Sequence, residues 1–179
     1  MSALFFLVVT SCGSVTMASG FAIVEQSAKG IGAALAGVAS DTEDPASLFF
    51  NPAGAAYTDK FTLAAGFHLI DLSFEFNDVA STPVGGQSIN NGGTAAPVPN
   101  LYLIAPLTDK INFGLGVTAP YGLVTEYDDD WLGRFHAIKS DLKLYNINPT
   151  VTVAVNEQFA LAGGINAIYS DAEFTQALS

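Results

Sequence analysis

The chain has 179 residues, of which half are hydrophobic and only 13% are charged, and its mean hydropathy is +0.37. Because soluble domains carry about 25% charged residues, this composition argues against an ordinary soluble domain, and the formal net charge of −11 argues against a nucleic-acid partner. No apolar run reaches the length of about 18 residues that suggests a membrane-spanning helix. A high apolar content without a membrane-spanning helix suggests either a buried core or a membrane β-barrel.

Residues 1–18 are predicted to be an export signal that is cleaved after Ala18. An apolar run from Ala3 to Val9 is followed by small residues up to the predicted cleavage site. No Lys or Arg precedes the run, so either the true start lies upstream or the signal is atypical. The single cysteine, Cys12, is interpreted either as part of a lipoprotein cleavage box or, as the short apolar run favours, as a small residue within the signal.

Residues 19–57 are predicted to form a compact helical unit. Glycines and alanines are frequent in its first part, which favours close packing but not an independent helix. Two helix starts follow closely, at Asp44-Pro45 and Asn51-Pro52. In each, the Asx side chain can cap free N–H groups while proline takes the first helical position. Only very short helices fit between the two starts.

Residues 58–179 are predicted to contain five β-strands, at about 61–77, 98–107, 111–123, 142–155 and from 159 onward. Apolar residues alternate in each strand. In the first strand the alternation changes phase near Leu69 and Ile70, which indicates a bulge or a strand that is apolar on both faces. In the third strand, apolar residues from Ile111 to Leu123 are expected on one face.

The connections between these strands alternate in length. Long loops at 78–97 and 124–141 alternate with tight turns at 108–110 and 156–158. This asymmetry, with strands long enough to span a membrane, is typical of outer-membrane barrels. A soluble sandwich is the alternative, but its strands are usually nearer to 5–6 residues. The fold class predicted is all-β, a transmembrane antiparallel β-barrel. Because bacterial barrels have even strand numbers from about 8 upward, the chain is expected to be the N-terminal part of one.

Three motifs carry a resemblance to a known family: Asn51-Pro52-Ala53, the segment from Pro120 to Tyr127, and Trp131-Leu132-Gly133-Arg134. Together they make the chain, from Gly20 to Tyr169, resemble the FadL/TodX group of outer-membrane transporters of long-chain fatty acids and aromatic hydrocarbons. The resemblance implies a monomeric barrel of about 14 strands that is plugged by an N-terminal hatch and needs no cofactor. It also implies capture of a hydrophobic small molecule outside the cell and lateral release into outer-membrane lipid, through an opening made by a kink in the third strand.

The predicted gate combines a hatch motif with the third strand. The hatch residues are Asn51, Pro52, Ala53 and Gly54, and the kink residues are Gly114, Gly116, Pro120 and Gly122. Proline cannot donate to a strand ladder, so Pro120 marks a bulge or a break in pairing, or alternatively the end of the strand. We expect the hatch motif to contact the Pro120 region. The ligand site is otherwise unassigned, with candidates Phe67, Phe74 and Phe76 on the first strand.

The charged residues suggest several further roles. Arg134, Lys139 and Lys143 form a basic cluster at the outer rim, which either binds lipopolysaccharide phosphates or an anionic substrate, or is neutralised by Asp128–Asp130. The aspartate triplet could bind calcium but is more simply solvated, and no metal site is predicted. The first three strands contain few cations, which favours a neutral cargo because a buried carboxylate without a cation is costly.

The sequence gives little support for catalysis. Its two histidines, His68 and His136, lie in the first strand and the second long loop. No nucleophile elbow or phosphate loop accompanies them, so the chain is predicted not to be an enzyme. An outer-membrane lipid hydrolase that uses His68, and a structural or adhesin barrel without cargo, remain as alternatives.

Overall fold

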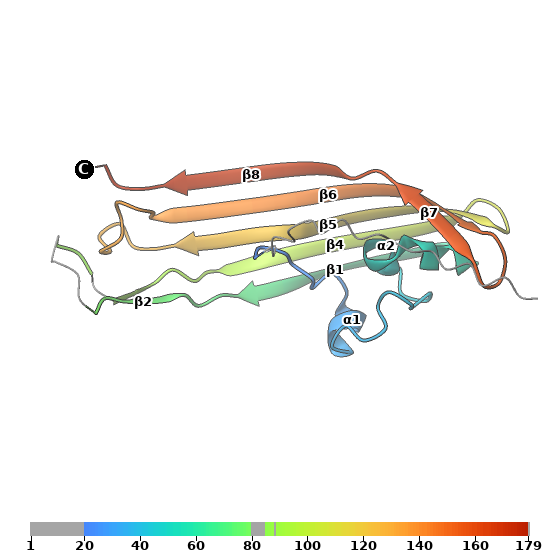
Figure 1. Ribbon diagram of the computed structural model, residues 1–179, viewed down its shortest axis with the longest axis horizontal. Coiled ribbons are helices and arrows are strands. Elements are labelled where there is room, and N and C mark those ends of the chain that lie inside the picture. The colour runs from blue at the N-terminus through green and yellow to red at the C-terminus, as the bar shows by residue number, and fades with distance from the viewer. Residues whose placement is uncertain (1–19, 80–84, 88, 179) are drawn as a thin grey trace, which may run out of the picture.

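The computed structural model describes residues 20–79, 85–87 and 89–178, which form a long antiparallel sheet with helical segments against it (Figure 1). The main sheet has the order β1-β4-β5-β6-β7, and β8 also pairs with β6. Its strands are β1 (Thr62–Asp71), β4 (Ala95–Pro106), β5 (Ile111–Glu126), β6 (Lys139–Ala154), β7 (Ala160–Gly164) and β8 (Ala167–Thr175). A separate hairpin pairs β2 (Glu75–Asn77) with β3 (Ile89–Asn91).

Three short helices precede the sheet: α1 (Ala28–Gly32), α2 (Ser47–Phe50) and the 3-10 helix η1 (Pro52–Tyr57). In Figure 1, α2 lies beside the sheet, whereas α1 stands away from it. Among the described residues, no helix is both long and apolar enough to cross a membrane.

Strands are found near all five predicted places, but their limits differ. The first predicted strand ends as β1 at Asp71, and Glu75–Asn77 forms β2 in the separate hairpin. The fifth strand is divided into β7 and β8, which pair with β6 in one register and are separated by Ile165 and Asn166. The side chain of Asn148 compensates for this break, since its amide donates to Ile165 O and Asn166 Oδ1 at 3.0 Å. The predicted loops are shorter than expected, because the first contains β3 and the start of β4 and the second is shortened by the ends of β5 and β6.

Of the two interpretations of the first strand, the bulge is wrong, and the strand that is apolar on both faces agrees with the structure at the end of β1. The β1–β4 ladder runs from Thr62↔Ile104 to Asp71↔Ala95 without a shift. The phase change lies within β1, where Leu69 is 65% exposed on the outer face and its neighbour Ile70 is half-buried on the inner face. Phe67 is 71% exposed and lies on the same face as Leu63 and Leu69, so its side chain does not face the helices.

The two faces of the sheet have the polarity of a membrane barrel. On β5 and β6 the buried residues that face the helices are polar, whereas the exposed residues on the other face are apolar. Thr152 is fully buried, for example, while its neighbour Val151 is 46% exposed. The buried polar set consists of Asn112, Thr118, Asn146, Thr150 and Thr152. An apolar outer face over a polar interior is the arrangement expected where the outside is lipid.

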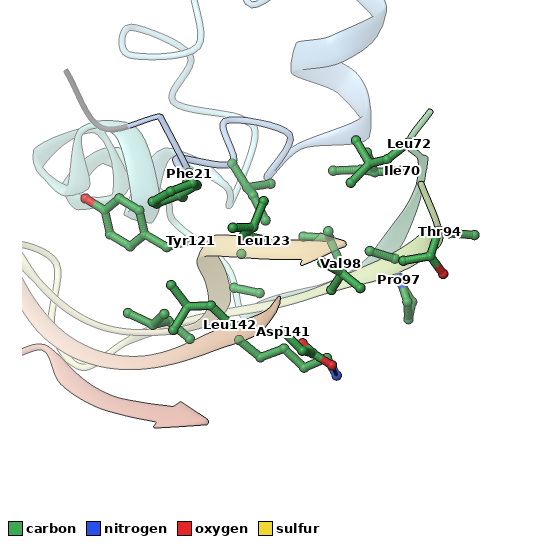
Figure 2. Close-up of a pocket in the computed structure, with 18 of the residues that line it drawn as sticks. Phe21, Ile70, Leu72, Thr94, Pro97, Val98, Tyr121, Leu123, Asp141 and Leu142 are labelled. Atoms are coloured by element: carbon green, nitrogen blue, oxygen red, sulfur yellow. Dashed lines mark hydrogen bonds and ion pairs between the residues drawn. The ribbon is translucent and has the colours of Figure 1, made fainter. Parts of the chain in front are cut away.

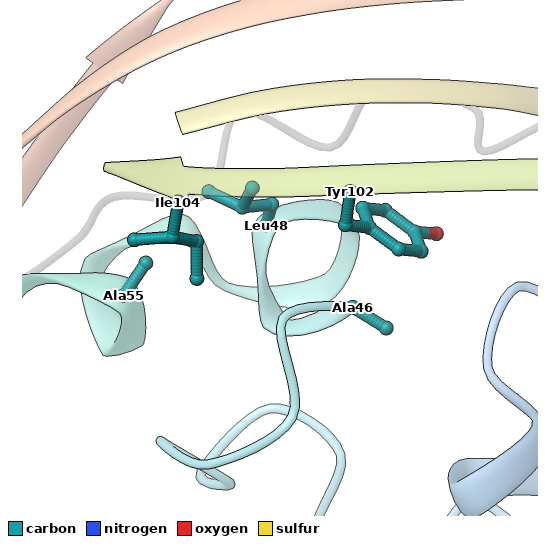
Figure 3. Close-up of a cluster of buried hydrophobic side chains, with 5 residues drawn as sticks. All are labelled: Ala46, Leu48, Ala55, Tyr102 and Ile104. Carbon is teal, nitrogen blue, oxygen red and sulfur yellow. The ribbon is translucent and has the colours of Figure 1, made fainter. Parts of the chain in front are cut away.

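Residues 20–57, which we call the plug after their predicted role, are held against the sheet by a small apolar core. Ala46, Leu48 and Ala55 pack against Tyr102 and Ile104 of β4 (Figure 3). A Cβ atom on Gly114 of β5 would lie 2.5 Å from Leu48 Cδ2, so this glycine leaves room for the leucine. The space that Gly114 leaves on the inner face of β5 is therefore filled by the plug.

Neither predicted side-chain cap forms at the start of its helix. Asp44 Oδ1 accepts a hydrogen bond from Ala46 N at 2.9 Å, but α2 begins only at Ser47, and its N-cap residue Ala46 makes no side-chain capping bond. Asn51 makes no capping bond to η1; its side-chain amide donates instead to Ala39 O at 2.8 Å. The cap prediction at Asn51 is wrong because the asparagine ties the turn to an earlier loop.

We expect Leu48→Ala to loosen the plug. Leu48 is 3% exposed, and replacing a buried leucine by alanine costs about 2–5 kcal/mol. Amide hydrogen exchange of residues 45–57 should therefore become faster, while exchange in β6 stays unchanged. The matched control is Leu107→Ala, since Leu107 is 63% exposed. Equal exchange rates at 45–57 in both variants would show that Leu48 does not anchor the plug.

Candidate functional site

The wall of the sheet opens between β4 and β5. Their ladder runs from Pro106↔Asn112 to Leu101↔Val117 and then ends. The neighbouring ladders continue, since β1 pairs with β4 as far as Ala95 and β5 pairs with β6 as far as Glu126. At the far end Glu126 N donates to Gly92 O at 3.0 Å. The opening is therefore bounded by hydrogen bonds at both ends.

A β-bulge lies beside this opening. Thr118 pairs with Asn146 and Tyr121 with Leu144, so that Ala119 and Pro120 lie opposite the single residue Tyr145. The predicted irregularity at Pro120 is confirmed, and the alternative that Pro120 ends the strand is wrong, because β5 continues to Glu126.

The bulge also corrects the predicted face of the third strand. Before it, Ile111 and the other odd-numbered residues lie on the outer face. After it, Tyr121 and Leu123 pair with Leu144 and Leu142 and share the inner face with them. An extra residue in one strand shifts the alternation by one position, so the apolar residues up to Leu123 do not form one continuous face.

The N-terminal segment 20–26 occupies the free edge of β5. Ala22 forms an isolated antiparallel bridge with Tyr121. Ile23 N donates to Pro120 O at 2.9 Å, and Gly122 N donates to Phe21 O at 3.1 Å. This segment therefore supplies the backbone partners that β4 does not provide.

The predicted contact between the hatch motif and Pro120 is wrong. Residues 51–54 lie at the start of η1, near the tight-turn end of the sheet. There, Asn112 Nδ2 donates to Ala55 O at 2.7 Å and to Thr58 O at 2.8 Å. An extended segment can pair with a strand edge, whereas a 3-10 turn uses its own backbone groups internally, so residues 21–23 make the contact.

Gln26 connects the two sides of the opening. It is fully buried, and its Nε2 donates to Ala119 O at 3.0 Å on the bulge. Its backbone O accepts a hydrogen bond of 2.9 Å from the Tyr102 hydroxyl on β4. One residue of the plug thus bonds to both strands where their ladder has ended.

We expect Gln26→Ala to release the N-terminal segment. The substitution leaves Ala119 O unpaired in a buried place, which costs about 1–3 kcal/mol. Amide exchange at residues 21–23 should become faster by about fivefold or more. Gln158→Ala, in the exposed turn after β6, serves as the control. A Gln26→Ala protein with normal exchange at Ile23 would contradict the role of the glutamine.

A largely apolar cavity of about 570 Å³ lies at the opening. Figure 2 shows Phe21 and Tyr121 on one side and Ile70 and Leu72 on another. Its other apolar walls come from Val98, Leu123, Leu142 and Leu144. Residues from β1, β4, β5, β6 and the plug therefore meet in one site.

The three ligand candidates lie in different places. Phe74 lines the cavity. Phe76 packs edge-on against Trp131, with ring centroids 5.2 Å apart, in the cluster that joins the β2–β3 hairpin to the second long loop. Phe67 lies on the outer face. Only Phe74 is therefore placed to touch a molecule in the cavity.

The predicted basic cluster is divided among separate partners. Lys139 bonds to Glu173 and Lys143 to Asp141, each at 2.6 Å. Arg134 donates to the backbone oxygens of Gly85 at 2.7 Å and Trp131 at 3.2 Å. Among the described residues, none of these three side chains forms an ion pair with Asp128–Asp130.

The aspartate triplet makes contacts of its own at the long-loop end. Asp128 accepts from Asn90 at 2.7 Å, and Asp130 accepts from Gln87 at 2.9 Å. Among the described residues no group of three or more His, Cys, Asp or Glu side chains could hold a metal ion. These carboxylates thus connect the two long loops.

His68 has no catalytic arrangement in the part of the chain that the structure describes. Its Nε2 is buried and has no hydrogen-bond partner there. It lies opposite Val98 in the β1–β4 ladder. A histidine that acts as a general base needs a nucleophile within hydrogen-bond reach.

An ion pair stiffens the loop that follows α1. Lys29 Nζ lies 2.5 Å from Asp41 Oδ2. The hydrogen bond from Lys29 is the main cause that lowers the pKa of Asp41, and the hydrogen bond from the backbone N–H of Glu43 is the next. The same side-chain bond raises the pKa of Lys29. A carboxyl whose pKa is lowered in the folded state stabilises it above its unfolded pKa of about 3.9, and this contribution is lost as the pH falls.

We therefore expect residues 29–44 to become more accessible to an acid-tolerant protease as the pH falls below about 4. The effect should be small, since Lys29 is largely exposed. Asp41→Asn removes this carboxyl and should flatten that part of the pH profile. An unchanged profile in Asp41→Asn would assign the acid sensitivity to other groups.

Comparison with known proteins gives the family. The family model described as outer membrane protein transport protein (OMPP1/FadL/TodX) matches residues 9–179. The chain belongs to the OMPP1/FadL/TodX family. This confirms the resemblance that the three sequence motifs carry.

Two curated relatives and one solved structure support this assignment. The long-chain fatty acid transport protein of Escherichia coli (strain K12) is 31% identical over 157 residues, which cover 87% of this chain and 34% of that protein. Outer membrane protein P1 of Haemophilus influenzae is 32% identical over 170 residues, covering 87% and 37%. A Pseudomonas aeruginosa FadL homologue superposes with a TM-score of 0.71 and 25% identity, over 88% of this chain and 39% of that chain. The chain thus spans about a third of the length of these curated relatives, and its fold is that of a FadL-type barrel.

Several residues of the site were not singled out in the sequence. Phe21, Ile23 and Gln26 lie in a short segment without a recognisable motif. Leu142 and Leu144 share a face with the polar Asn146, so their alternation did not mark them as cavity residues. One signal was available in the sequence. The face of β6 that carries Asn146 is otherwise polar, so the leucines on it mark the part of that face that lines an apolar cavity.

Proposed function

We propose that the protein takes part in passive uptake of hydrophobic small molecules, long-chain fatty acids or aromatic hydrocarbons, across the Gram-negative outer membrane. The observation that carries this proposal is the apolar cavity at an opening in the wall, whose free strand edge is occupied by residues 21–23 of the plug. A removable segment at such an opening is suited to control passage. The names of the relatives, which include fatty acid transport proteins, support the same activity.

The polarity of the inner wall supports lateral release into the membrane. Beside the opening the inner wall is apolar, through Val98, Leu142 and Leu144. Beyond the bulge it becomes polar, through Thr118, Thr150 and Thr152, and the plug packs against it. Transfer of apolar surface into a polar, hydrated space is unfavourable, so an apolar molecule is better accommodated by leaving through the opening into lipid.

A neutral cargo fits the charges of the described cavity best. Lys139 and Lys143 both line the cavity, but each already bonds to a carboxylate. Glu25 and Glu126 also line it, so an entering carboxylate would meet negative charge. Within this part of the barrel, an uncharged hydrocarbon is accommodated at lower cost than a fatty-acid anion.

The remaining features of the proposal follow from an outer-membrane barrel. Residues 1–18, which lie outside the described residues, would serve as a cleaved export signal. The exposed apolar residues of β5 to β8 would face membrane lipid, and the rim of Arg134, Lys139 and Lys143 would lie near lipopolysaccharide. A monomer is expected for a barrel whose wall closes on itself.

Complementation of a transporter-deleted strain tests the proposal. Cells that express the full-length protein should grow on a hydrophobic carbon source and take up radiolabelled toluene or oleate. Deletion of Asn51–Gly54 should alter uptake while the protein still inserts, because these residues belong to the plug. If uptake is indifferent to that deletion, or if full-length protein gives no uptake at all, the plugged-barrel mechanism is wrong.

A further inference from the structure

The backbone groups of β4 point alternately to its two neighbours. At one end Leu107 N donates to Ile111 O at the start of β5, and at the other Leu72 N, which follows β1, donates to Thr94 O. In an antiparallel strand, the N–H and C=O groups of one residue point to the same neighbouring strand, and those of the next residue point to the other neighbour. The odd-numbered residues of β4 therefore face β5, and the even-numbered residues face β1.

Two prolines occupy the β5-facing positions of β4 at the opening. They are Pro97 and Pro99, directly beyond the last paired residue, Leu101. Proline has no N–H, so neither can donate to β5. The ladder between β1 and β4 does not need these groups and continues to Ala95.

The opposite strand has a proline at the matching place. If the β4–β5 ladder continued past the bulge, the one-residue shift would set Pro99 opposite Pro120 and Pro97 opposite Gly122. In the first of these pairs neither residue could donate a hydrogen bond. In the second, only Gly122 could.

We propose that Pro97 and Pro99 are positioning residues that, with Pro120, keep the seam between β4 and β5 open and reserve the edge of β5 for the N-terminal segment. The segment supplies what the prolines lack, since Ile23 N donates to Pro120 O and Phe21 O accepts from Gly122 N. With both N–H groups absent, β4 competes poorly for that edge. This inference rests on the proposed function only for its effect on uptake.

Restoring the missing donors tests the inference. In Pro97→Val/Pro99→Val, each regained N–H should favour closure of the seam by roughly two- to tenfold. Pro106→Val is the matched control, because Pro106 lies on the same strand but faces the other edge, beyond the end of the β1 ladder.

Disulfide trapping reads the position of the strands directly. In full-length protein with Cys12→Ser and Tyr121→Cys, a second cysteine is placed either at Ala22, the present partner, or at Val98, the partner in a closed seam. On mild oxidation, the pair 22/121 should cross-link and the pair 98/121 should not, both in the background with the native prolines and in Pro106→Val. In Pro97→Val/Pro99→Val the pair 98/121 should cross-link instead. Uptake by the Pro97→Val/Pro99→Val variant should be lost.

The outcomes separate the two proposals. Cross-links that stay at 22 in the double variant overturn the role of the prolines. A cross-link that moves to 98 while uptake continues supports that role and counts against lateral release. If the double variant does not insert, Pro99→Ala alone carries the same test, since it restores the donor nearest the end of the ladder.

Discussion

Oxidised full-length protein carrying Ala22→Cys and Tyr121→Cys should lose uptake of hydrophobic molecules, and a reductant should restore it. These residues are direct antiparallel bridge partners. Such pairs have Cα atoms about 4.5–5.5 Å apart, within the range of about 4.4–6.8 Å that disulfides span. The bond would fasten the N-terminal segment to β5 without altering the wall, so it tests whether that segment must move.

Uptake of labelled toluene into cells, measured with and without reductant, provides the readout. Each single-cysteine variant, in a Cys12→Ser background, controls for the loss of the native side chain. A second pair, Val151→Cys with Gly163→Cys, joins β6 to β7 away from the opening and should leave uptake unchanged. Uptake at the parent rate in the fully oxidised Ala22/Tyr121 variant would show that the segment is not a gate.

The wall of the molecule was largely predictable because its signals are local. Alternation of apolar and polar residues, together with tight turns such as Thr108-Asp109-Lys110, is enough to place β4, β5 and β6. The missing N–H of Pro120 likewise predicts an interruption at its own position, and the bulge is found there. Such properties depend on residues near in sequence.

The partners of these elements were less predictable, since a free strand edge accepts any extended segment that can reach it. Nothing in Phe21 or Ile23 distinguishes them in sequence from other apolar residues, and the Asn51 motif was the more conspicuous candidate. The bulge also has a remote effect that a periodic pattern cannot show. It transfers Tyr121 and Leu123 to the inner face and thereby creates part of the cavity wall.

The opening and the plug depend on one another through backbone hydrogen bonding. Exposed edge groups of a strand favour pairing with another segment, and an unpaired backbone group in lipid costs several kcal/mol. The prolines of β4 therefore reduce the number of unpaired donors at the opening, while residues 21–23 satisfy the edge of β5. If the segment left, the edge of β5 would lose the partners of Pro120 O and Gly122 N, and Tyr102 of β4 would lose its bond to Gln26 O.

Leu142→Asn should weaken binding of a neutral hydrocarbon about tenfold or more. Leu142 lines the cavity from β6 (Figure 2), and burial of a leucine side chain contributes about 1.5–3 kcal/mol, where 1.4 kcal/mol is a factor of ten in affinity. The amide has nearly the same shape but retains water, which the cargo must displace. Leu142→Met, a change that keeps volume and apolarity, should bind as the parent does. Titration of purified full-length protein with toluene in detergent measures both. Equal affinities in the two variants would show that the hydrocarbon binds elsewhere. Only a molecule that contacts residue 142 would bind differently when that side chain is an amide and when it is a thioether.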